Sequence, residues 1–211
     1  MTMTKIKNSL NTEAVIDESV FENTDNTVWL FGYGSILWKT NFKFVKECVG
    51  YIKGYKRRFY QYSPDHRGTI EFPGRVVTLL PSRNESQVWG VAYAISNQNI
   101  KEVYEKLDFR EQAGYMKYIV PFYSKIKEDV APKEVIVYVA DEKNKWFAGK
   151  ATIYQIASRI MLCQGVSGLN SEYVYKLADA MRKKAPDAND KHLFELENIL
   201  KCLEKRQTVT V

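Results

Sequence analysis

The chain has 211 residues, a formal net charge of +6, and a composition of 45% hydrophobic and 13% aromatic residues. Its length allows one domain or at most two small ones, and its apolar content excludes an intrinsically disordered protein. The positive charge favours anionic partners, including small anions, without requiring nucleic acid.

Cysteine and histidine usage excludes several kinds of site. The three cysteines, Cys48, Cys163 and Cys202, lie far apart and form no C-x-x-C pair, so neither a disulfide framework nor a cysteine-based zinc site is expected. His66 and His192 are too few for metal motifs that need clustered imidazoles. We therefore expect no metal and a reducing compartment.

Membrane association is not expected either. The amino-terminal residues contain no apolar leader-like segment, and no run in the sequence approaches about 18 uninterrupted apolar residues. We expect a soluble, cytoplasmic protein. No heptad seam is visible, which favours a monomer.

Residues 1–27 differ in composition from the rest of the chain. Asn, Thr and Ser are frequent there, and two lysines face five acidic residues. Such a segment buries little apolar surface to offset the entropy lost on ordering. We expect a flexible acidic arm over residues 1–27 and a folded domain over residues 28–211, with a partner-binding or autoinhibitory arm as the alternative.

After the arm, the pattern changes to short strands separated by Gly, Pro and Asn turn signals. Six runs rich in β-branched and aromatic residues are the candidate strands: Val28–Tyr33, Val49–Tyr62, Gly74–Leu80, Gln87–Ile95, Tyr115–Tyr123 and Glu134–Ala140. A helix over Asn99–Phe109 is expected between the fourth and fifth strands, with Asn97 as its N-cap.

The last third of the chain predicts helices. The three candidates are Thr152–Cys163, Ser171–Lys184 and Asn189–Glu204, and Pro186 ends the second. Strands followed by helices indicate an α+β protein. We expect a small mixed barrel or sheet flanked by helices, with a helical C-terminal third.

The first candidate site is Phe31-Gly32-Tyr33-Gly34-Ser35, at the end of the first predicted strand. Its two glycines let the backbone approach a ligand and expose N–H groups to a carboxylate or phosphate. Leu37 stands where the Rossmann pattern needs its third glycine, and the flanking residues do not fit the hydrolase G-x-S-x-G elbow. Taken alone, the segment is a weak signal, and a tight turn without function is the favoured interpretation.

The second candidate is Glu111, which follows Leu107-Asp108-Phe109-Arg110 and precedes Gly114-Tyr115 where a helix gives way to a strand. A carboxylate at such a junction, partly desolvated in a pocket, has a raised pKa and becomes a usable base. The alternative is a solvated side chain paired with Arg110.

Two further patterns are weaker. On a single strand, the stretch Tyr51–Tyr62 would alternate cations with aromatic rings, as in platforms for single-stranded nucleic acid, but a half-buried strand shows the same alternation. His66, beside Asp65 and Arg67, invites a catalytic triad with Ser35, although a lone histidine in a polar turn is more often structural. We expect no nucleic acid partner.

Taken together, these segments resemble the ChaC-type family of glutathione-specific γ-glutamylcyclotransferases, from about Val28 to Glu204. The resemblance rests on several motifs in order: Phe31-Gly32-Tyr33-Gly34-Ser35 with Trp38, Asp65-His66-Arg67-Gly68, Pro73-Gly74-Arg75-Val76-Val77-Thr78-Leu79, Val88-Trp89-Gly90-Val91-Ala92-Tyr93, Leu107-Asp108-Phe109-Arg110-Glu111 with Gly114-Tyr115, and His192-Leu193-Phe194.

The resemblance implies a small mixed barrel that splits reduced glutathione into 5-oxoproline and cysteinylglycine without cofactor or metal. It implies Glu111 as the catalytic acid/base. The implied binding site for the γ-glutamyl group comprises Leu30, Phe31, Gly32, Tyr33, Gly34 and Ser35. Arg75 and Tyr115 are further candidates for contacts with substrate. Two alternatives stay open: a cyclotransferase acting on other γ-glutamyl compounds, and a non-catalytic binding or regulatory protein with the same fold.

Overall fold

Five strands close into a barrel in the computed structural model, which describes residues 5–8, 13–15, 27–83, 85–110, 115–125 and 131–209. The barrel strands are β3 (Thr27–Gly32), β4 (Lys46–Lys53), β7 (Gln87–Ser96), β8 (Met116–Ser124) and β9 (Glu134–Val139). Their order is β8-β4-β7-β3-β9, and β9 pairs back onto β8 to complete the ring.

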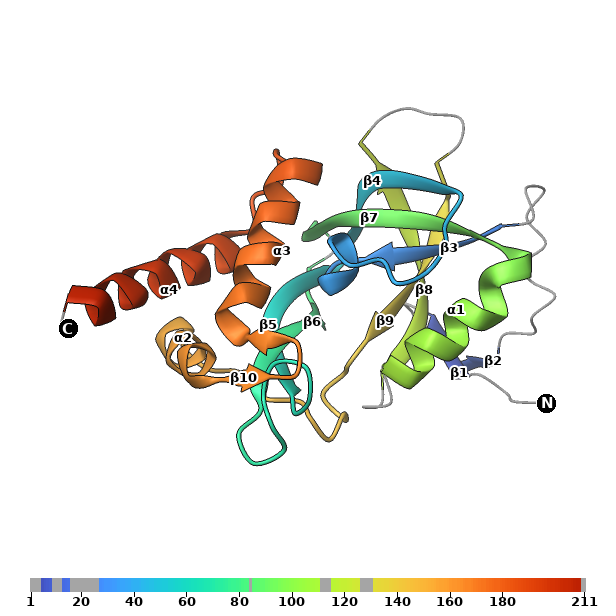
Figure 1. The fold of residues 1–211 in the computed structure, drawn as a ribbon. Helices are drawn as coiled ribbons and strands as arrows, with labels where there is room; N and C mark the ends of the chain where they lie inside the picture. Colours follow the sequence, from blue (N-terminus) through green and yellow to red (C-terminus); the bar gives the residue numbers. More distant parts are fainter. Residues whose placement is uncertain are drawn as a thin grey trace.

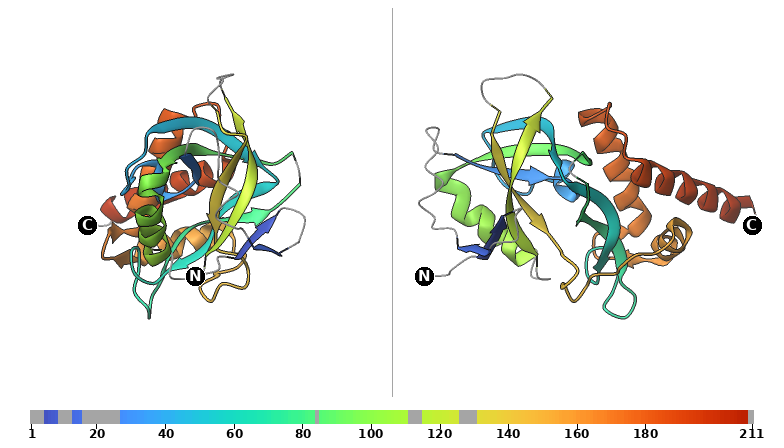
Figure 2. Two further views of the ribbon diagram at one scale, coloured as in Figure 1. Left: turned by 90° about the vertical axis from the view of Figure 1, so that its right-hand side faces the viewer. Right: turned by 180° about the vertical axis from the view of Figure 1, so that it is seen from behind.

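The barrel is mixed, as the sequence predicted. β3 runs parallel to β9, while the pairings β3–β7, β4–β7, β4–β8 and β8–β9 are antiparallel. Seen from behind, β8 and β9 cross in front of the barrel, and the C-terminal helices lie to one side of it (Figure 2). Closure leaves each of the five strands hydrogen-bonded on both sides, so the barrel has no open edge along its ring.

Two short strands join this sheet from the segment expected to be an arm. β1 (Lys5–Asn8) pairs with β8 in parallel and with β2 (Glu13–Val15) in antiparallel. Sequence analysis predicted neither strand, because three or four polar-flanked residues carry no detectable alternation. A flexible acidic arm over residues 1–27 and the boundary at residue 28 stay predictions.

The expected single strand Val49–Tyr62 was wrong: the chain turns at Gly54, whose φ of 81° lies in the left-handed region that favours glycine. The turn separates β4 from β5 (Tyr55–Ser63), which leaves the barrel and pairs with β6 (Gly74–Pro81) as a separate hairpin. The rings of Phe59 and Tyr60 are buried. The nucleic-acid alternative therefore loses its exposed aromatic platform.

The helices lie in two places (Figure 1). α1 (Asn97–Arg110) packs beside β3 and β7, and it begins at Asn97 itself, the residue expected to precede it as the cap. α2 (Ile153–Leu162), α3 (Asn170–Lys184) and α4 (Lys191–Val209) gather around the β5–β6 hairpin, and α3 also contacts β7 of the barrel. The expected α+β class is confirmed.

Local signals explain where α2 begins. The Thr152 hydroxyl accepts a hydrogen bond from the backbone N–H of Gln155, and the Gln155 side chain accepts one from the Thr152 N–H, which completes a capping box. The short strands β10 (Gln164–Gly165) and β11 (Gly168–Leu169) form a hairpin between α2 and α3. Within the described residues, none of the helices combines the length and apolarity needed to cross a bilayer.

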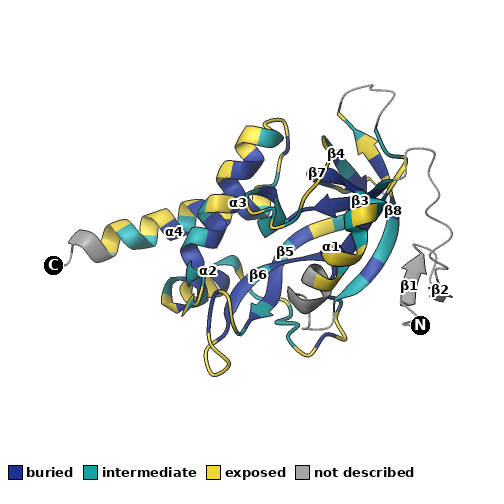
Figure 3. Ribbon diagram, turned by 45° about the vertical axis from the view of Figure 1, so that its right-hand side comes forward, coloured by how far each residue is buried: buried dark blue, intermediate teal, exposed yellow. Residues whose placement is uncertain are grey.

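Two apolar clusters hold these layers together. Figure 3 marks in dark blue the buried residues along the strands and helices. Alternation along β3 divides its side chains between them: Val28 and Leu30 join the smaller cluster under α1, whereas Phe31 joins the main core. The main core continues through the hairpin to buried residues of α3 and α4, including Leu177 and Leu193. The end of β3 therefore lies between the two apolar clusters.

Close backbone packing fixes the end of β3. A Cβ added at Gly90 of β7 would lie 2.3 Å from the Gly32 carbonyl oxygen and 2.7 Å from the Phe31 ring. The backbone oxygen cannot move aside without displacing β3. Gly90 thus sets the position of the strand that leads into the Tyr33-Gly34-Ser35 segment.

We expect Gly90→Ala to lower the free energy of unfolding by about 3 kcal/mol, because the overpacked methyl group displaces β3. Urea unfolding measures the change. Gly54→Ala is the comparison, since among the described residues no atom outside the flanking ones lies within 4 Å of a Cβ there, and the left-handed φ of 81° opposes the change. The free energy of unfolding of Gly54→Ala should fall by about 1 to 2 kcal/mol. Equal losses in both variants would contradict the steric argument.

His192 at the start of α4 joins the helices to the hairpin. Its Nε2 accepts a hydrogen bond from the Phe59 backbone N–H at 3.4 Å, and its ring centroid lies 6.0 Å from that of Phe59. Burial, reinforced by the positive charge of Arg58, lowers the His192 pKa from 6.5 to about 4. A proton on Nε2 would also remove the acceptor for Phe59.

Stability should therefore fall as pH falls from 6.5 towards 4, because over this range the unfolded chain binds a proton that the folded protein excludes. The full loss from this group is about 3 kcal/mol at 1.36 kcal/mol per pKa unit. Urea unfolding of wild type and His192→Gln from pH 7 to pH 4 isolates the contribution. Parallel stability curves for the two proteins would contradict the assignment.

Candidate active site

A cavity of about 1090 Å³ opens where β3 ends. The segment after β3, the end of β5, the turn between β10 and β11 and the first turns of α3 line it, together with Tyr115 before β8 and Tyr138 of β9. These elements come from the barrel, the hairpin and the C-terminal helices, which meet here (Figure 1). A cavity at such a junction, of this size, suits a small peptide-like ligand.

The expected substrate-binding segment lies in this cavity. Leu30, Phe31, Tyr33, Gly34 and Ser35 all line it. Gly32 does not: it pairs with Val91 in the sheet, and a Cβ there would lie 3.1 Å from the Tyr93 ring. Gly32 therefore shapes the segment from behind.

Hydrogen bonds hold the segment in place. The Tyr33 hydroxyl donates to the Tyr138 carbonyl oxygen at 2.8 Å, which ties the segment to β9. The 3₁₀ turn η2 (Ser35–Leu37) follows, and the Leu37 N–H donates to the Gly34 carbonyl oxygen at 3.0 Å. The Tyr93 hydroxyl donates to the Ile36 carbonyl oxygen at 3.3 Å. The segment is thus a preorganised wall of the cavity.

Gly34 has a steric reason to be glycine. Its φ of −126° is open to other residues, but an added Cβ would lie 3.1 Å from both the Tyr173 hydroxyl and the Val77 side chain. Tyr173 itself is buried and meets Trp38 edge to face, with ring centroids 5.2 Å apart. The glycine lets α3 and the hairpin close directly behind the cavity wall.

Glu111, the expected catalytic carboxylate, lies outside the described residues. Tyr115, four positions later in the sequence, lines the cavity, which agrees with its expected approach to substrate. The role of Glu111 as acid/base stays a prediction.

Sequence analysis missed Arg67 as a site residue, although it quoted the Asp65-His66-Arg67-Gly68 motif. Four basic side chains line the cavity, Lys39, His66, Arg67 and Lys176, and Arg67 is the buried one, with 6% of its surface exposed. Its Nη1 donates to the Leu169 carbonyl oxygen at 2.8 Å and lies 3.4 Å from a Glu172 carboxylate oxygen. A cation buried in a cavity wall indicates a binding site for an anion. The burial arises only in the folded protein, so the sequence alone did not reveal it.

Arg75 does not line the cavity. Its Nη1 donates to the carbonyl oxygens of Phe59 at 3.0 Å and Gly149 at 3.3 Å, and its backbone N–H donates to the Asn170 side chain at 2.7 Å. A contact of Arg75 with substrate stays a prediction, and the observed hydrogen bonds tie β6 to β5 and to α3.

The proposed triad also differs from the observed contacts. His66 Nδ1 lies 3.0 Å from the Ser167 hydroxyl, and Nε2 lies 3.8 Å from an Asp65 carboxylate oxygen. The imidazole thus joins the β10–β11 turn to the end of β5. Among the described residues, no three His, Cys, Asp or Glu side chains gather closely enough to hold a metal ion.

The closed five-stranded barrel, the detached hairpin and the cavity between them are the features to compare with known proteins. A crystal structure of a yeast γ-glutamyl cyclotransferase specific to glutathione matches with a TM-score of 0.74 and 27% identity, over 84% of this chain and 99% of that chain. The family model described as ChaC-like protein matches residues 28–203. The chain therefore belongs to the ChaC-like family.

Its relatives share a named activity. The chain is 42% identical over 177 residues to glutathione-specific gamma-glutamylcyclotransferase 1 of Danio rerio, covering 83% of this chain and 89% of that protein. It is 36% identical over 186 residues to the glutathione-specific gamma-glutamylcyclotransferase of Schizosaccharomyces pombe, covering 82% of this chain and 92% of that protein.

Proposed function

We propose that this chain splits reduced glutathione into 5-oxoproline and cysteinylglycine, with no metal or cofactor. The cavity of about 1090 Å³ carries the proposal, because Leu30, Phe31, Tyr33, Gly34 and Ser35 all line it. Membership of the ChaC-like family and relatives named for glutathione-specific cyclotransfer support it.

The substrate brings its own nucleophile. The α-amine of the glutamyl residue attacks the side-chain amide carbonyl, closes a five-membered lactam, and expels the amine of cysteinylglycine. Holding the glutamyl chain in the folded conformation contributes up to about 7 to 11 kcal/mol through effective molarity. The anchored Tyr33-Gly34-Ser35 wall suits this task, since its backbone N–H groups can hold a carboxylate or the polarised carbonyl oxygen.

Proton transfer is the second requirement, because an ammonium group cannot attack. With an α-amino pKa of about 8 and an ordinary glutamic acid pKa of about 4.3, transfer to Glu111 is uphill by about 5 kcal/mol. Desolvation by bound substrate would raise the carboxyl pKa and reduce this cost. The protonated carboxyl then donates to the leaving amine, so Glu111 serves as base and acid in turn.

The other half of glutathione ends in a carboxylate, and Arg67 is placed to receive it. The guanidinium is held in the wall by the Leu169 carbonyl oxygen at 2.8 Å, and its carboxylate neighbour, Glu172, is 42% exposed and also pairs with Lys176 at 3.1 Å. An arginine with only a weak, solvent-screened partner retains capacity for a second carboxylate. We assign Arg67 to the glycine end of the substrate.

Release of 5-oxoproline by the purified protein tests the reaction. We expect release from reduced glutathione, with an equal amount of cysteinylglycine, and much slower release from γ-glutamyl amino acids that lack the terminal carboxylate position. Comparable release from those compounds would favour the broader cyclotransferase. No release from any γ-glutamyl compound, by a sample whose circular dichroism shows it folded, would favour a binding protein.

We also propose that the protein is a monomer and that it lies in the cytoplasm. The thiols of Cys48, Cys163 and Cys202 are all free, which suits a reducing compartment, and residues of this chain line the cavity proposed to hold the substrate. Sedimentation velocity checks the oligomeric state, and a dimer at micromolar concentration would contradict it.

A further inference from the structure

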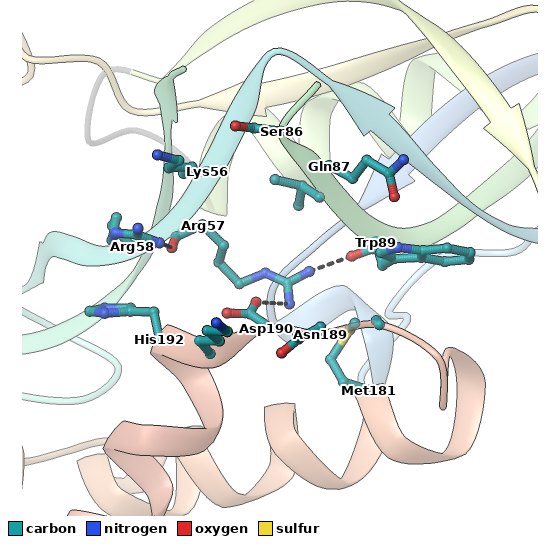
Figure 4. Close-up of a pocket in the computed structure, with 13 residues that line it drawn as sticks. Lys56, Arg57, Arg58, Ser86, Gln87, Trp89, Met181, Asn189, Asp190 and His192 are labelled. Carbon is teal, nitrogen blue, oxygen red and sulfur yellow. Dashed lines mark hydrogen bonds and ion pairs between the residues drawn. The ribbon is translucent and has the colours of Figure 1, made fainter. Parts of the chain in front are cut away.

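A second pocket, of about 260 Å³, lies between the β5–β6 hairpin and the helices (Figure 4). The start of β5, the start of β7, Met181 of α3 and the residues that lead into α4 line it. It shares no lining residue with the larger cavity. We call it the hairpin–helix pocket.

Its lining is strongly cationic. Lys56, Arg57, Arg58 and Lys191 supply positive charges, and Asp190 is the single carboxylate. Asp190 is already engaged, because one of its oxygens lies 2.9 Å from Arg57 Nη1 and the other accepts the Leu193 N–H at 3.1 Å. The pocket therefore keeps a net positive charge that its own carboxylate does not neutralise.

Among the described residues, the remaining three cations have no ion-pair partner. In the part of the chain that the structure describes, no carboxylate lies within 4.0 Å of the charged groups of Lys56, Arg58 or Lys191. Each of these charges adds to the positive potential at the pocket, which an anion bound there would lower.

Arg57 gives the pocket a fixed donor. Only 3% of its surface is exposed; Nη1 is held by Asp190, and Nη2 donates to the Trp89 carbonyl oxygen. Its Nε is buried and has no hydrogen-bond partner among the described residues. Figure 4 shows the guanidinium spanning the pocket from β5 towards Asp190. The two paired nitrogens fix the guanidinium in the pocket wall, where its positive charge adds to that of the other cations.

The first turn of α4 adds to this potential. α4 has 19 residues, and Asp190 caps its N-terminal end by accepting the Leu193 N–H. The positive end of the helix dipole therefore faces the same pocket as the three unpaired cations. The small volume favours a compact anion over an extended peptide.

We propose that the hairpin–helix pocket binds a phosphate group, either as inorganic phosphate or as the terminal phosphate of a small ester. The fixed guanidinium of Arg57 and the charges of Arg58 and Lys191 attract the anion from β5 and α4. Because the anion joins these two elements, binding stabilises the packing of the helices on the hairpin and raises the unfolding temperature by mass action. The site is independent of glutathione cleavage.

Calorimetric titration with inorganic phosphate, at ionic strength held constant with sodium chloride, tests the site. We expect saturable one-site binding that weakens by about tenfold or more in the double variant Arg58→Gln/Lys191→Gln, which leaves Arg57 in place. The matched control is Lys143→Gln/Lys145→Gln, which removes two exposed charges elsewhere and should bind phosphate like wild type.

Glycerol 3-phosphate, titrated in parallel, distinguishes the two sources of the phosphate group. Binding of both compounds, with the same dependence on Arg58 and Lys191, supports a site open to phosphate esters, and binding of inorganic phosphate alone supports a site for the free anion. Absence of saturable binding by wild type would overturn the proposal. So would equal binding by the double variant, or competition with glutathione, which would locate the anion in the larger cavity.

Discussion

Replacing Glu111 with Gln is expected to lower the kcat for glutathione by about 10²- to 10⁴-fold and to change KM little. Glutamine is similar in size to glutamate but cannot take the proton from the substrate ammonium or return it to the leaving amine. Binding of the glutamyl half, which rests on the anchored Tyr33-Gly34-Ser35 wall, should persist. Timed release of 5-oxoproline over a range of glutathione concentrations separates the two parameters.

The control is Glu105→Gln, which removes an exposed carboxylate from α1, six residues before Glu111 in the sequence. It should cleave glutathione at the wild-type rate. Near-wild-type turnover by Glu111→Gln would remove the carboxylate from the mechanism without affecting the reaction itself, because wild-type release of 5-oxoproline tests the reaction separately. A large rise in KM with unchanged kcat would instead make Glu111 a binding residue.

The strands that sequence analysis located well are those with strong local patterns. β6, β7 and β9 begin at Gly74, Gln87 and Glu134, as the runs of β-branched residues predicted. The failure at Val49–Tyr62 has a physical cause: propensity is continuous across Gly54, and only its left-handed φ divides the run between two sheets. Barrel closure through β8 and β9 is a tertiary pairing with no local signal.

In the candidate site, too, features with a local pattern could be predicted from the sequence and tertiary contacts could not. The two glycines and the strand end identified the cavity wall around Tyr33-Gly34-Ser35, because that chemistry is local. Arg67 was not assigned, since a surface arginine and an arginine buried in a cavity wall look alike in the sequence. Its burial depends on α3 and the β10–β11 turn, which lie about one hundred positions later in the chain. Arg75, by contrast, was a candidate for a contact with substrate, but its guanidinium donates to backbone carbonyl oxygens in the folded protein.

Specificity for glutathione is expected to depend on Arg67. Arg67→Gln should lower kcat/KM for glutathione by about 10- to 100-fold, which corresponds to one lost charge-assisted contact of about 1.5 to 3 kcal/mol. The effect should fall mainly on KM, because the terminal carboxylate is far from the reacting amide. Steady-state kinetics with reduced glutathione give the two parameters.

A second substrate distinguishes recognition from a structural role. Arg67 also donates to the Leu169 carbonyl oxygen, so its loss could loosen the β10–β11 turn. Glutathione whose glycine carboxylate is replaced by a carboxamide lacks the group that Arg67 is assigned to bind. Wild type and Arg67→Gln should cleave this amide at similar, slow rates. If the variant slows cleavage of both substrates by the same factor, Arg67 is structural only.

Two further variants complete the test. Glu172→Gln removes the neighbour 3.4 Å from Arg67 Nη1 and leaves the guanidinium in place, so KM for glutathione should stay the same or fall. Arg83→Gln removes an exposed arginine outside the cavity and should behave like wild type. A rise in KM in Glu172→Gln comparable to that in Arg67→Gln would mean that the pair acts as a unit of structure, and the assignment of Arg67 to the substrate carboxylate would then fail.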